Sequence, residues 1–353
     1  MTTTLDSARV KTRALELGFD LCGVAPAAGF PELRFLREWV DRGYSGEMAY
    51  MARTAARRGD VRHIVPSARS VIACAMVYNV DRPYSTESND VQSGHVARYA
   101  WGDDYHEVMS RRLEALLSWM RATSDTPFDA KAYVDTGPVQ ERVYAQYAGL
   151  GWIGKNTCLI NPERGSWLFL CEIISSLPLD PDPAALDQCG TCTLCLEACP
   201  TGALVEPYVM DATRCVSYLT IEMRGTIPAE LRPGLGGHVY GCDICQEVCP
   251  WNAVPAVSTS AHWQPRAEWD RPKLLDLWRW SDQDLGAATR HSAMARAKLT
   301  GLRRNVAVAI GNCGGAEAAA VLDEVRPDAP SVQNPVVAEH VEWAKSRLRS
   351  ATE

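Results

Sequence analysis

The sequence lacks the segments that would carry a protein into or across a membrane. No stretch approaches the ~18 uninterrupted apolar residues of a transmembrane helix, although hydrophobic residues make up 46% of the chain. Residues 1–11 are polar and contain no apolar core of a secretion signal. These absences predict a cytoplasmic protein without a membrane anchor. In that compartment disulfides are rare, and clustered cysteines indicate metal or redox sites.

Common nucleotide fingerprints and, locally, acidic residues are also missing. No Gly-x-Gly-x-x-Gly follows a predicted strand, and no phosphate-binding loop of the Gly-Lys-Ser/Thr type is present, so the sequence does not itself indicate NAD, FAD or ATP. Residues 285–316 contain no Asp or Glu, although the whole chain has a net charge of −7. The overall charge argues against nucleic-acid binding. The basic stretch is either a solvated helix face, which is the commoner case, or a site of interaction with phosphates.

Cysteine, in contrast, is abundant and ordered. Eight of the 13 cysteines lie between Cys189 and Cys249, and the first group has the spacing C-x2-C-x2-C-x3-C-P. This spacing is typical of bacterial-type [4Fe–4S] ferredoxins, in which the fourth cysteine binds the other cluster. Crossing the groups in this way leaves the second cluster one ligand short, and Cys215 completes its set. The predicted ligands are Cys189, Cys192, Cys195 and Cys249 for one cluster, and Cys199, Cys215, Cys242 and Cys245 for the other.

Zinc and disulfides are the alternatives for these cysteines. Zinc ribbons also use C-x2-C pairs, but they do not require a third cysteine and a fourth before proline. Disulfides would require an oxidising compartment. The remaining cysteines lie among apolar or small residues, where a free thiol commonly behaves as a small buried hydrophobe. We predict a structural role for them: Cys22, Cys74, Cys158, Cys171 and Cys313.

The chain is long enough for two or three domains. Helical patterns, such as residues 104–121, alternate with apolar runs, such as residues 70–78, and predict an α/β domain. The Pro- and Asp-rich segment 177–186 marks its end. The cysteine-rich segment follows, and helices dominate after residue 273 in an arrangement that suggests one or two α-solenoid repeats. The predicted domains are 1–180, 181–255 and 256–353.

Asp135 is the most informative residue outside the cysteine region. It follows a predicted strand, residues 128–134, and precedes Thr-Gly-Pro. In open α/β sheets the ligand crevice lies beyond the carboxyl ends of the strands. A partly desolvated carboxyl group there can have a raised pKa and donate a proton near neutrality. The alternative is an N-cap for a helix beginning near Pro138, and the residues alone do not decide between the two.

Polar segments punctuated by glycine accompany Asp135. They are RYAWGDDYH (98–106), VDTGPVQER (134–142) and GLGWIGKNT (149–157). The glycines of the last segment either allow a bulky ligand to approach the backbone or only make turns. Lys155 in the same segment either pairs with an anionic ligand group or is simply exposed.

Together with four further segments, these motifs resemble the epoxyqueuosine reductases along essentially the whole chain. The further segments are CPTGA (199–203), RCVSYLTIE (214–222), GCDICQEVCPWN (241–252) and HSAMARAKLTGLRRNVAVAIGN (291–312). This family consists of cobalamin-dependent iron–sulfur enzymes of queuosine tRNA modification. It is similar to the reductive dehalogenases and carries a C-terminal HEAT-like helical module.

The resemblance implies both the cofactors and the reaction. The α/β domain would bind cobalamin, and the ferredoxin-like domain would relay electrons from an external low-potential donor through two [4Fe–4S] clusters. The substrate would be epoxyqueuosine at the wobble position of a tRNA, reduced to queuosine with loss of oxygen as water. The proton donor of the family falls on Asp135. We also expect a monomer.

The resemblance further implies residues for the two binding surfaces. The cofactor-binding candidates are Arg58, Tyr99, Tyr105, His106, Asp135, Gly154, Lys155, Asn156, Ser217 and Asp243. A tRNA partner favours the interpretation of the acid-free stretch as a site of phosphate contact. The tRNA-binding candidates in this stretch are Arg290, Arg296, Lys298, Arg303 and Arg304. Two rival interpretations are a reductase acting on a small molecule and an electron carrier that serves another protein.

Overall fold

A computed structural model describes residues 5–315 and 317–350, so the first four residues of the polar N-terminal segment and Ala316 of the acid-free stretch lie outside it. Its main sheet has four strands in the order β1-β2-β7-β4. Every pairing is antiparallel. The main sheet is therefore antiparallel and not the parallel sheet usual for alternating strands and helices. The strands are β1 (Leu21–Pro26), β2 (Ser70–Val77), β4 (Ala130–Tyr133) and β7 (Leu168–Ser175).

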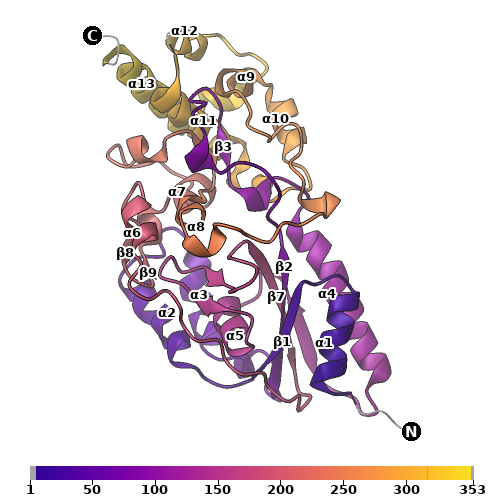
Figure 1. Cartoon of the computed structure of the whole chain (residues 1–353). Helices are drawn as coiled ribbons and strands as arrows, with labels where there is room; N and C mark the ends of the chain where they lie inside the picture. The colour runs from indigo at the N-terminus through magenta and orange to yellow at the C-terminus, as the bar shows by residue number, and fades with distance from the viewer. Residues whose placement is uncertain (1–4, 316, 351–353) are drawn as a thin grey trace.

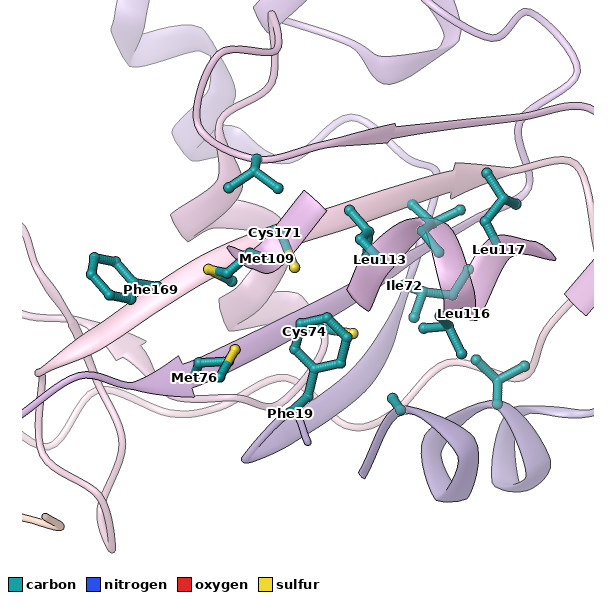
Figure 2. Packing of buried hydrophobic residues seen from close by; sticks show 14 of the residues in the cluster. Phe19, Ile72, Cys74, Met76, Met109, Leu113, Leu116, Leu117, Phe169 and Cys171 are labelled. Atoms are coloured by element: carbon teal, nitrogen blue, oxygen red, sulfur yellow. The ribbon is translucent and has the colours of Figure 1, made fainter. Parts of the chain in front are cut away.

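Helices cover both faces of this sheet (Figure 1). On one face, α1 (Ser7–Glu16) and α4 (Tyr105–Thr123) bury the cluster drawn in Figure 2, where Phe19, Met109 and Leu113 lie against the strands. The opposite face is covered by α2 (Pro31–Asp41), α3 (Ala49–Arg58) and α5 (Glu141–Tyr147). Since both faces are covered, all eight positions of β2 are buried, which explains its continuous apolar sequence.

The cysteine region contains only short elements, as expected for loops that surround metal clusters. Two short helices, α6 and α8, end immediately before Cys199-Pro200 and close to Cys249-Pro250, because proline cannot continue a helix. The elements here and in the preceding hairpin are β5 (Trp152–Ile153), β6 (Leu159–Ile160), α6 (Leu194–Ala198), β8 (Leu204–Glu206), β9 (Val209–Met210), α7 (Val216–Ile221) and α8 (Ile244–Glu247).

The C-terminal part is helical, as predicted, and is built around one central helix. Residues 301–311 of α11 (Lys298–Cys313) are all buried, because α11 packs against α9, α13 and β10. A helix that is covered all round belongs to a core rather than to a surface. The other helices are α9 (Leu274–Arg279), α10 (Asp282–Ala288), α12 (Ala318–Leu322) and α13 (Pro335–Ser350).

The three predicted segments share their cores. β3 (His95–Val96) pairs in parallel with β10 (His238–Tyr240), and Val96 packs in one cluster with Trp269 and Trp278. A stretch of the first segment is thus built into the C-terminal core. The boundaries at 180 and 255 stay predictions. Within the described chain, no helix combines the length and apolarity needed to cross a membrane.

Candidate functional site

Four cysteines from the two sequence groups line one pocket. Its wall contains Cys189, Cys192, Cys195 and Cys249, together with Lys155 and Trp251. These are the four cysteines that the crossed ferredoxin pattern assigns to one cluster. Thiols from two distant segments are thereby brought together around a shared space, as a cubane cluster requires.

A second group of thiols gathers beside the first. Burial raises the pKa of Cys215, and the nearby Cys199 raises it further. Burial likewise raises the pKa of Cys242, to which Cys215 adds. Cys245 lies near both Cys215 and Cys242 and is hydrogen-bonded to Cys158, which also raises its pKa. These buried thiols do not ionise readily on their own. Bound iron would stabilise their thiolates by its positive charge, so the group is appropriate for a metal cluster.

Cys158 therefore has a position that the sequence did not indicate. It was predicted to be structural, and it lies against Cys245, a predicted cluster ligand. Nothing in the spacing signals this contact, because Cys158 precedes the ferredoxin motif and belongs to the segment that follows β5. Its hydrogen bond with Cys245 lowers the pKa of Cys158.

A separate polar site surrounds Asp135. The Tyr105 hydroxyl donates to its Oδ2 at 3.0 Å, and His106 Nε2 lies 3.3 Å from the same atom. The other ring nitrogen of His106 lies 2.7 Å from Asp104 Oδ1. The imidazole thus bridges two carboxylates, while 60% of the Asp135 side chain stays exposed. This exposed carboxylate is open to a ligand.

The electrostatics of this site correct one expectation. Burial lowers the pKa of His106, but its hydrogen bonds and charge interactions with Asp104 and Asp135 outweigh this and raise it to about 9. Burial raises the pKa of Asp135, but hydrogen bonding and the charge of His106 outweigh it, so the pKa lies below its ordinary value. The predicted raised pKa of Asp135 is therefore wrong. Near neutrality the proton of the pair is on the imidazole.

The helix-cap alternative for Asp135 is also wrong. The following helix, α5, starts at Glu141, and Gln140 occupies its N-cap position. Asp135 instead adopts φ +54, in the left-handed region that Asp and Asn tolerate better than most residues. Its backbone N–H donates to Glu141 Oε1 at 2.6 Å. The carboxylate of Asp135 is thus left to its contacts with Tyr105 and His106.

Two acidic residues behind Asp135 were not predicted. Glu141 lies within the motif VDTGPVQER (134–142) but had no predicted role, and Glu172 lies in β7 with only 1% of its surface exposed. The available signal was a single carboxylate in the otherwise apolar strand sequence LFLCEIIS. Burial and the proximity of Asp135 raise the pKa of Glu141 to about 8.

Some predicted cofactor residues gather around Asp135. Arg58 donates to Val139 O at 2.7 Å, and its charge helps to lower the pKa of Asp135. Tyr99 packs edge-on against Tyr105, with ring centroids 6.2 Å apart. The structure thus brings together Arg58, Tyr99, Tyr105, His106 and Asp135.

Three other predicted cofactor residues lie beside the four-cysteine pocket and the neighbouring thiol group. Lys155 Nζ donates to the carbonyl oxygens of Gly190 and Cys192 at 2.7 and 3.0 Å. Asn156 donates to Cys245 O at 3.1 Å. At Gly154 a Cβ would come within 2.4 Å of Ile160 Cδ1, so a larger residue there would require the Ile160 side chain to shift. Their contact with cobalamin stays a prediction.

The last two cofactor candidates also have structural contacts. Ser217 lies in α7, and its hydroxyl is 3.5 Å from Cys242 O. Asp243 is buried, and its carboxylate accepts from Arg98 N at 2.7 Å. Burial raises the pKa of Asp243 to about 7. Asp243 thus joins the cysteine region to the segment that carries β3.

The structure corrects two of the five predicted tRNA contacts. Arg303 and Arg304 are completely buried in α11. Their guanidinium groups donate to backbone carbonyl oxygens, including Trp278 O at 2.8 Å from Arg303 and Gly225 O at 2.8 Å from Arg304. Neither side chain can reach a phosphate. The acid-free sequence did not reveal this, because only the packing around α11 buries these positions.

The other three basic residues lie on the surface. Arg290, Arg296 and Lys298 are exposed. Arg296 already forms a two-point ion pair with Glu222, at 2.9 and 2.7 Å. Arg290 and Lys298 are thus the better candidates for interaction with an anionic partner.

Two protein-family models match this chain, one over the region that includes Asp135 and the other over the cysteine region. Residues 58–136 match the family described as "Epoxyqueuosine reductase QueG, DUF1730". Residues 188–252 match the family described as "4Fe-4S double cluster binding domain". The chain is 40% identical over 343 residues to the epoxyqueuosine reductase of Pseudomonas aeruginosa, covering 96% of this chain and 93% of the relative. It is 37% identical over 337 residues to that of Escherichia coli, covering 95% and 88%.

Solved structures agree with the sequence relatives. An epoxyqueuosine reductase crystallised with an epoxyqueuosine-modified tRNA-Tyr stem loop superposes with a TM-score of 0.85 and 31% identity, covering 97% of this chain and 89% of that one. A solved structure of epoxyqueuosine reductase from Bacillus subtilis, with its catalytic aspartate loop swung out of the active site, gives the same TM-score and identity, covering 97% of this chain and 90% of that one. The chain belongs to the epoxyqueuosine reductase family.

Proposed function

We propose that this chain reduces epoxyqueuosine at the wobble position of tRNA to queuosine, with Asp135 as the proton donor. The observation that carries the proposal is the Asp104–His106–Asp135 arrangement, in which a protonated imidazole lies 3.3 Å from an exposed carboxylate. Removing an epoxide oxygen as water consumes a pair of electrons and a pair of protons. The site must therefore supply protons to an oxygen that leaves poorly as an alkoxide.

His106 and Asp135 have separate tasks in this mechanism. Asp135 is exposed toward the ligand side and touches the substrate oxygen, whereas His106 lies behind it and carries the proton near neutral pH. The first proton passes from His106 Nε2 through Asp135 Oδ2 to the oxygen; the imidazole then takes up a proton from water and delivers it as the second along the same route, so that the oxygen leaves as water. The Tyr105 hydroxyl fixes the carboxylate orientation. General acid catalysis of this kind contributes roughly 10²–10⁴-fold to a rate.

The cofactor sites are assigned from the thiols and from the family. The four-cysteine pocket and the neighbouring thiol group would each hold a [4Fe–4S] cluster. The aromatic and cationic side chains around Asp135 would border cobalamin, which supplies reducing equivalents at carbon when it is bound. An external low-potential donor, a single-chain state and a cytoplasmic location complete the proposal.

The tRNA would approach the Asp135 site along the exposed basic side chains. Arg290 and Lys298 lie at the start of the α11 region, and the adjoining His291 is hydrogen-bonded to Glu107 of α4. This contact joins the basic stretch to the helix that carries His106. An anticodon base splayed out of its stack would enter between them.

The Asp135→Asn variant tests the proposed acid. It should keep its iron and its bound cobalamin but form queuosine ~10²–10⁴-fold more slowly, because an amide cannot deliver a proton. The assay follows queuosine by liquid chromatography in epoxyqueuosine-containing tRNA, with and without added cobalamin. Asp125→Asn, on an exposed loop, is the matched control. Full activity of the Asp135 variant would exclude Asp135 as the donor.

A further inference from the structure

An acidic pair lies directly beneath the turn that carries Asp135. Glu172 is in the middle of the sheet, where β7 pairs it with Ala73 of β2 and Tyr133 of β4. It is 1% exposed, and neither of its carboxyl oxygens has a hydrogen-bond donor among the described residues. An unpartnered carboxylate at such a position is strongly disfavoured.

The Glu141 carboxyl group can supply the missing hydrogen-bond partner of Glu172. The two carboxyl groups lie within hydrogen-bonding reach of each other, so one proton between them gives Glu172 a donor and Glu141 an acceptor. Burial raises the pKa of both groups. Glu141 raises the pKa of Glu172 further, whereas the hydrogen bond from Glu172 lowers that of Glu141, as expected if Glu172 is the donor and Glu141 the acceptor. Two close carboxyl groups in a dry site retain a proton, because they cannot both be ionised.

The pair is connected to Asp135 through the backbone. Glu141 Oε1 accepts from Asp135 N at 2.6 Å, and Asp135 holds the left-handed φ of +54. The next residue, Thr136, donates its N–H to Val134 O at 2.5 Å and tightens the same turn. A half-buried acceptor therefore holds the backbone N–H of the residue that carries the exposed carboxylate.

We propose that Glu141 and Glu172 share one proton and together act as the positioning device for Asp135. Neutral Glu172 donates to Glu141, and Glu141 holds the Asp135 N–H. The kinetic part of this inference rests on the proposed function, because it takes Asp135 to be the acid. Glu141 and Glu172 do not touch the substrate; they are positioning residues.

Loss of the shared proton would release the turn. Two negative charges would then lie together under a third, that of Asp135, and their repulsion would displace Glu141 from the Asp135 N–H. Arg58 and Arg142 counter this only partly, by lowering the pKa of Glu172 and Glu141 respectively. The ionisable groups that face the pair are Arg58, Cys74, Tyr105, Tyr133, Asp135, Arg142, Tyr144 and Cys171.

Two measurements on the cobalamin-free protein test the pair without any turnover. Glu172→Gln keeps a donor in the form of its amide, whereas Glu172→Leu removes it. In the infrared, the wild-type minus Glu172→Gln spectrum at neutral pH should contain the C=O stretch of a protonated carboxyl group. The same difference for Glu114→Gln, an exposed glutamate of α4, should lack it. Absence of the band from the Glu172 difference would overturn the proposal.

Amide hydrogen exchange then tests the positioning. The peptide covering residues 134–142 should take up deuterium faster in Glu172→Leu, with Glu172→Gln close to wild type, because only the leucine variant frees the Asp135 N–H. Residues 70–77 of β2 should exchange equally slowly in all variants and report an intact sheet. Wild-type uptake at 134–142 in the leucine variant, with the sheet intact, would contradict the proposal.

Kinetic measurements on the enzyme with its clusters and cobalamin bound complete the test. Glu172→Leu should lower kcat for queuosine formation at least tenfold at an unchanged KM for tRNA. Glu172→Gln should move the alkaline fall of kcat to higher pH, since an amide cannot ionise. An unmoved alkaline limb in Glu172→Gln would overturn the proposal. If the wild-type enzyme itself formed no queuosine, the proposed function would fail, while the infrared and exchange results would still decide the role of the pair.

Discussion

At the scale of single residues, the His106–Asp135 contact decides which group stores the proton. An aspartate that is 60% exposed and next to a protonated imidazole is ionised near neutrality. His106 is the group whose pKa, at about 9, matches the requirement of an acid that must be charged at physiological pH. The aspartate then relays the proton instead of storing it.

The His106→Gln variant should therefore lose activity and change its pH dependence. The part of the alkaline fall of wild-type turnover that lies near pH 9 should come from His106, because the imidazolium then loses its proton. The glutamine variant should turn over at least ~10-fold more slowly and lose that part of the alkaline limb. The measurement is single-turnover queuosine formation between neutral and alkaline pH. His262→Gln is the control, since it removes another imidazole–carboxylate contact, with Asp103; a wild-type profile for His106→Gln would contradict the relay.

At the scale of elements, basic residues in and near α11 have two different roles. Its arginines satisfy carbonyl oxygens in the core, whereas the basic residues near its start are exposed. A buried arginine that donates to several carbonyls is part of the packing, and its loss leaves those acceptors without a donor. An exposed lysine interacts with a phosphate mainly through its charge.

Substitutions in and near α11 should distinguish these uses. Arg303→Met should lower the free energy of unfolding by about 3 kcal/mol, as measured by urea denaturation. Lys298→Ala should leave stability within ~0.5 kcal/mol but weaken tRNA binding and reduce its log–log salt slope by about 1. Lys131→Ala, an exposed lysine of β4, is the charge-matched control. An unchanged salt slope for Lys298→Ala would remove it from the interface.

The second feature at the scale of elements is the pair of predicted cluster sites, the four-cysteine pocket and the neighbouring thiol group. Cys215 is the N-cap residue of α7 and is the predicted ligand that lies outside both cysteine runs. Cys215→Ala should lose about half of the cluster iron, because each [4Fe–4S] cluster requires its own thiolates. Iron analysis and the visible spectrum check this, with Cys313→Ala as the control. Retention of all the iron would assign the fourth ligand elsewhere, and Cys158 is the nearest alternative thiol.

At the scale of the whole molecule, Arg98 joins the α/β part to the rest. Arg98 is 3% exposed, and its guanidinium donates to Asn79 Oδ1, Val80 O, Arg82 O and Pro83 O. Its backbone N–H donates to Asp243 in the cysteine region, beside the pairing of β3 with β10. The sheet, the cysteine region and the helical part are thereby fixed relative to one another.

Arg98→Met should weaken this junction. The loss of several buried bonds should cost about 3–5 kcal/mol, measured by urea denaturation with circular dichroism. The two sides should then unfold at separate midpoints, because the side chain that holds them together is gone. Arg111→Met on the exposed face of α4 controls for the removal of a charge. A single transition at the wild-type midpoint would show that the junction does not depend on Arg98.

The sequence by itself determined the cofactor chemistry and most of the regular elements. Cysteine spacing is local and predicted a four-thiol set that lines one pocket, while an apolar run and helical periodicity predicted β2 and α4 close to their observed bounds. These features depend on neighbours along the chain, where one residue type at a fixed spacing has one physical meaning.

Only the tertiary structure decided which charged residues are available and which are ionised. Arg303 and Lys298 belong to the same helix and the same basic stretch, yet one is buried and the other exposed. Asp135 and Glu172 are both carboxyl groups at the sheet, and their pKa values shift in opposite directions. Burial and partner charge come from segments that are distant in sequence, so no local pattern contains them.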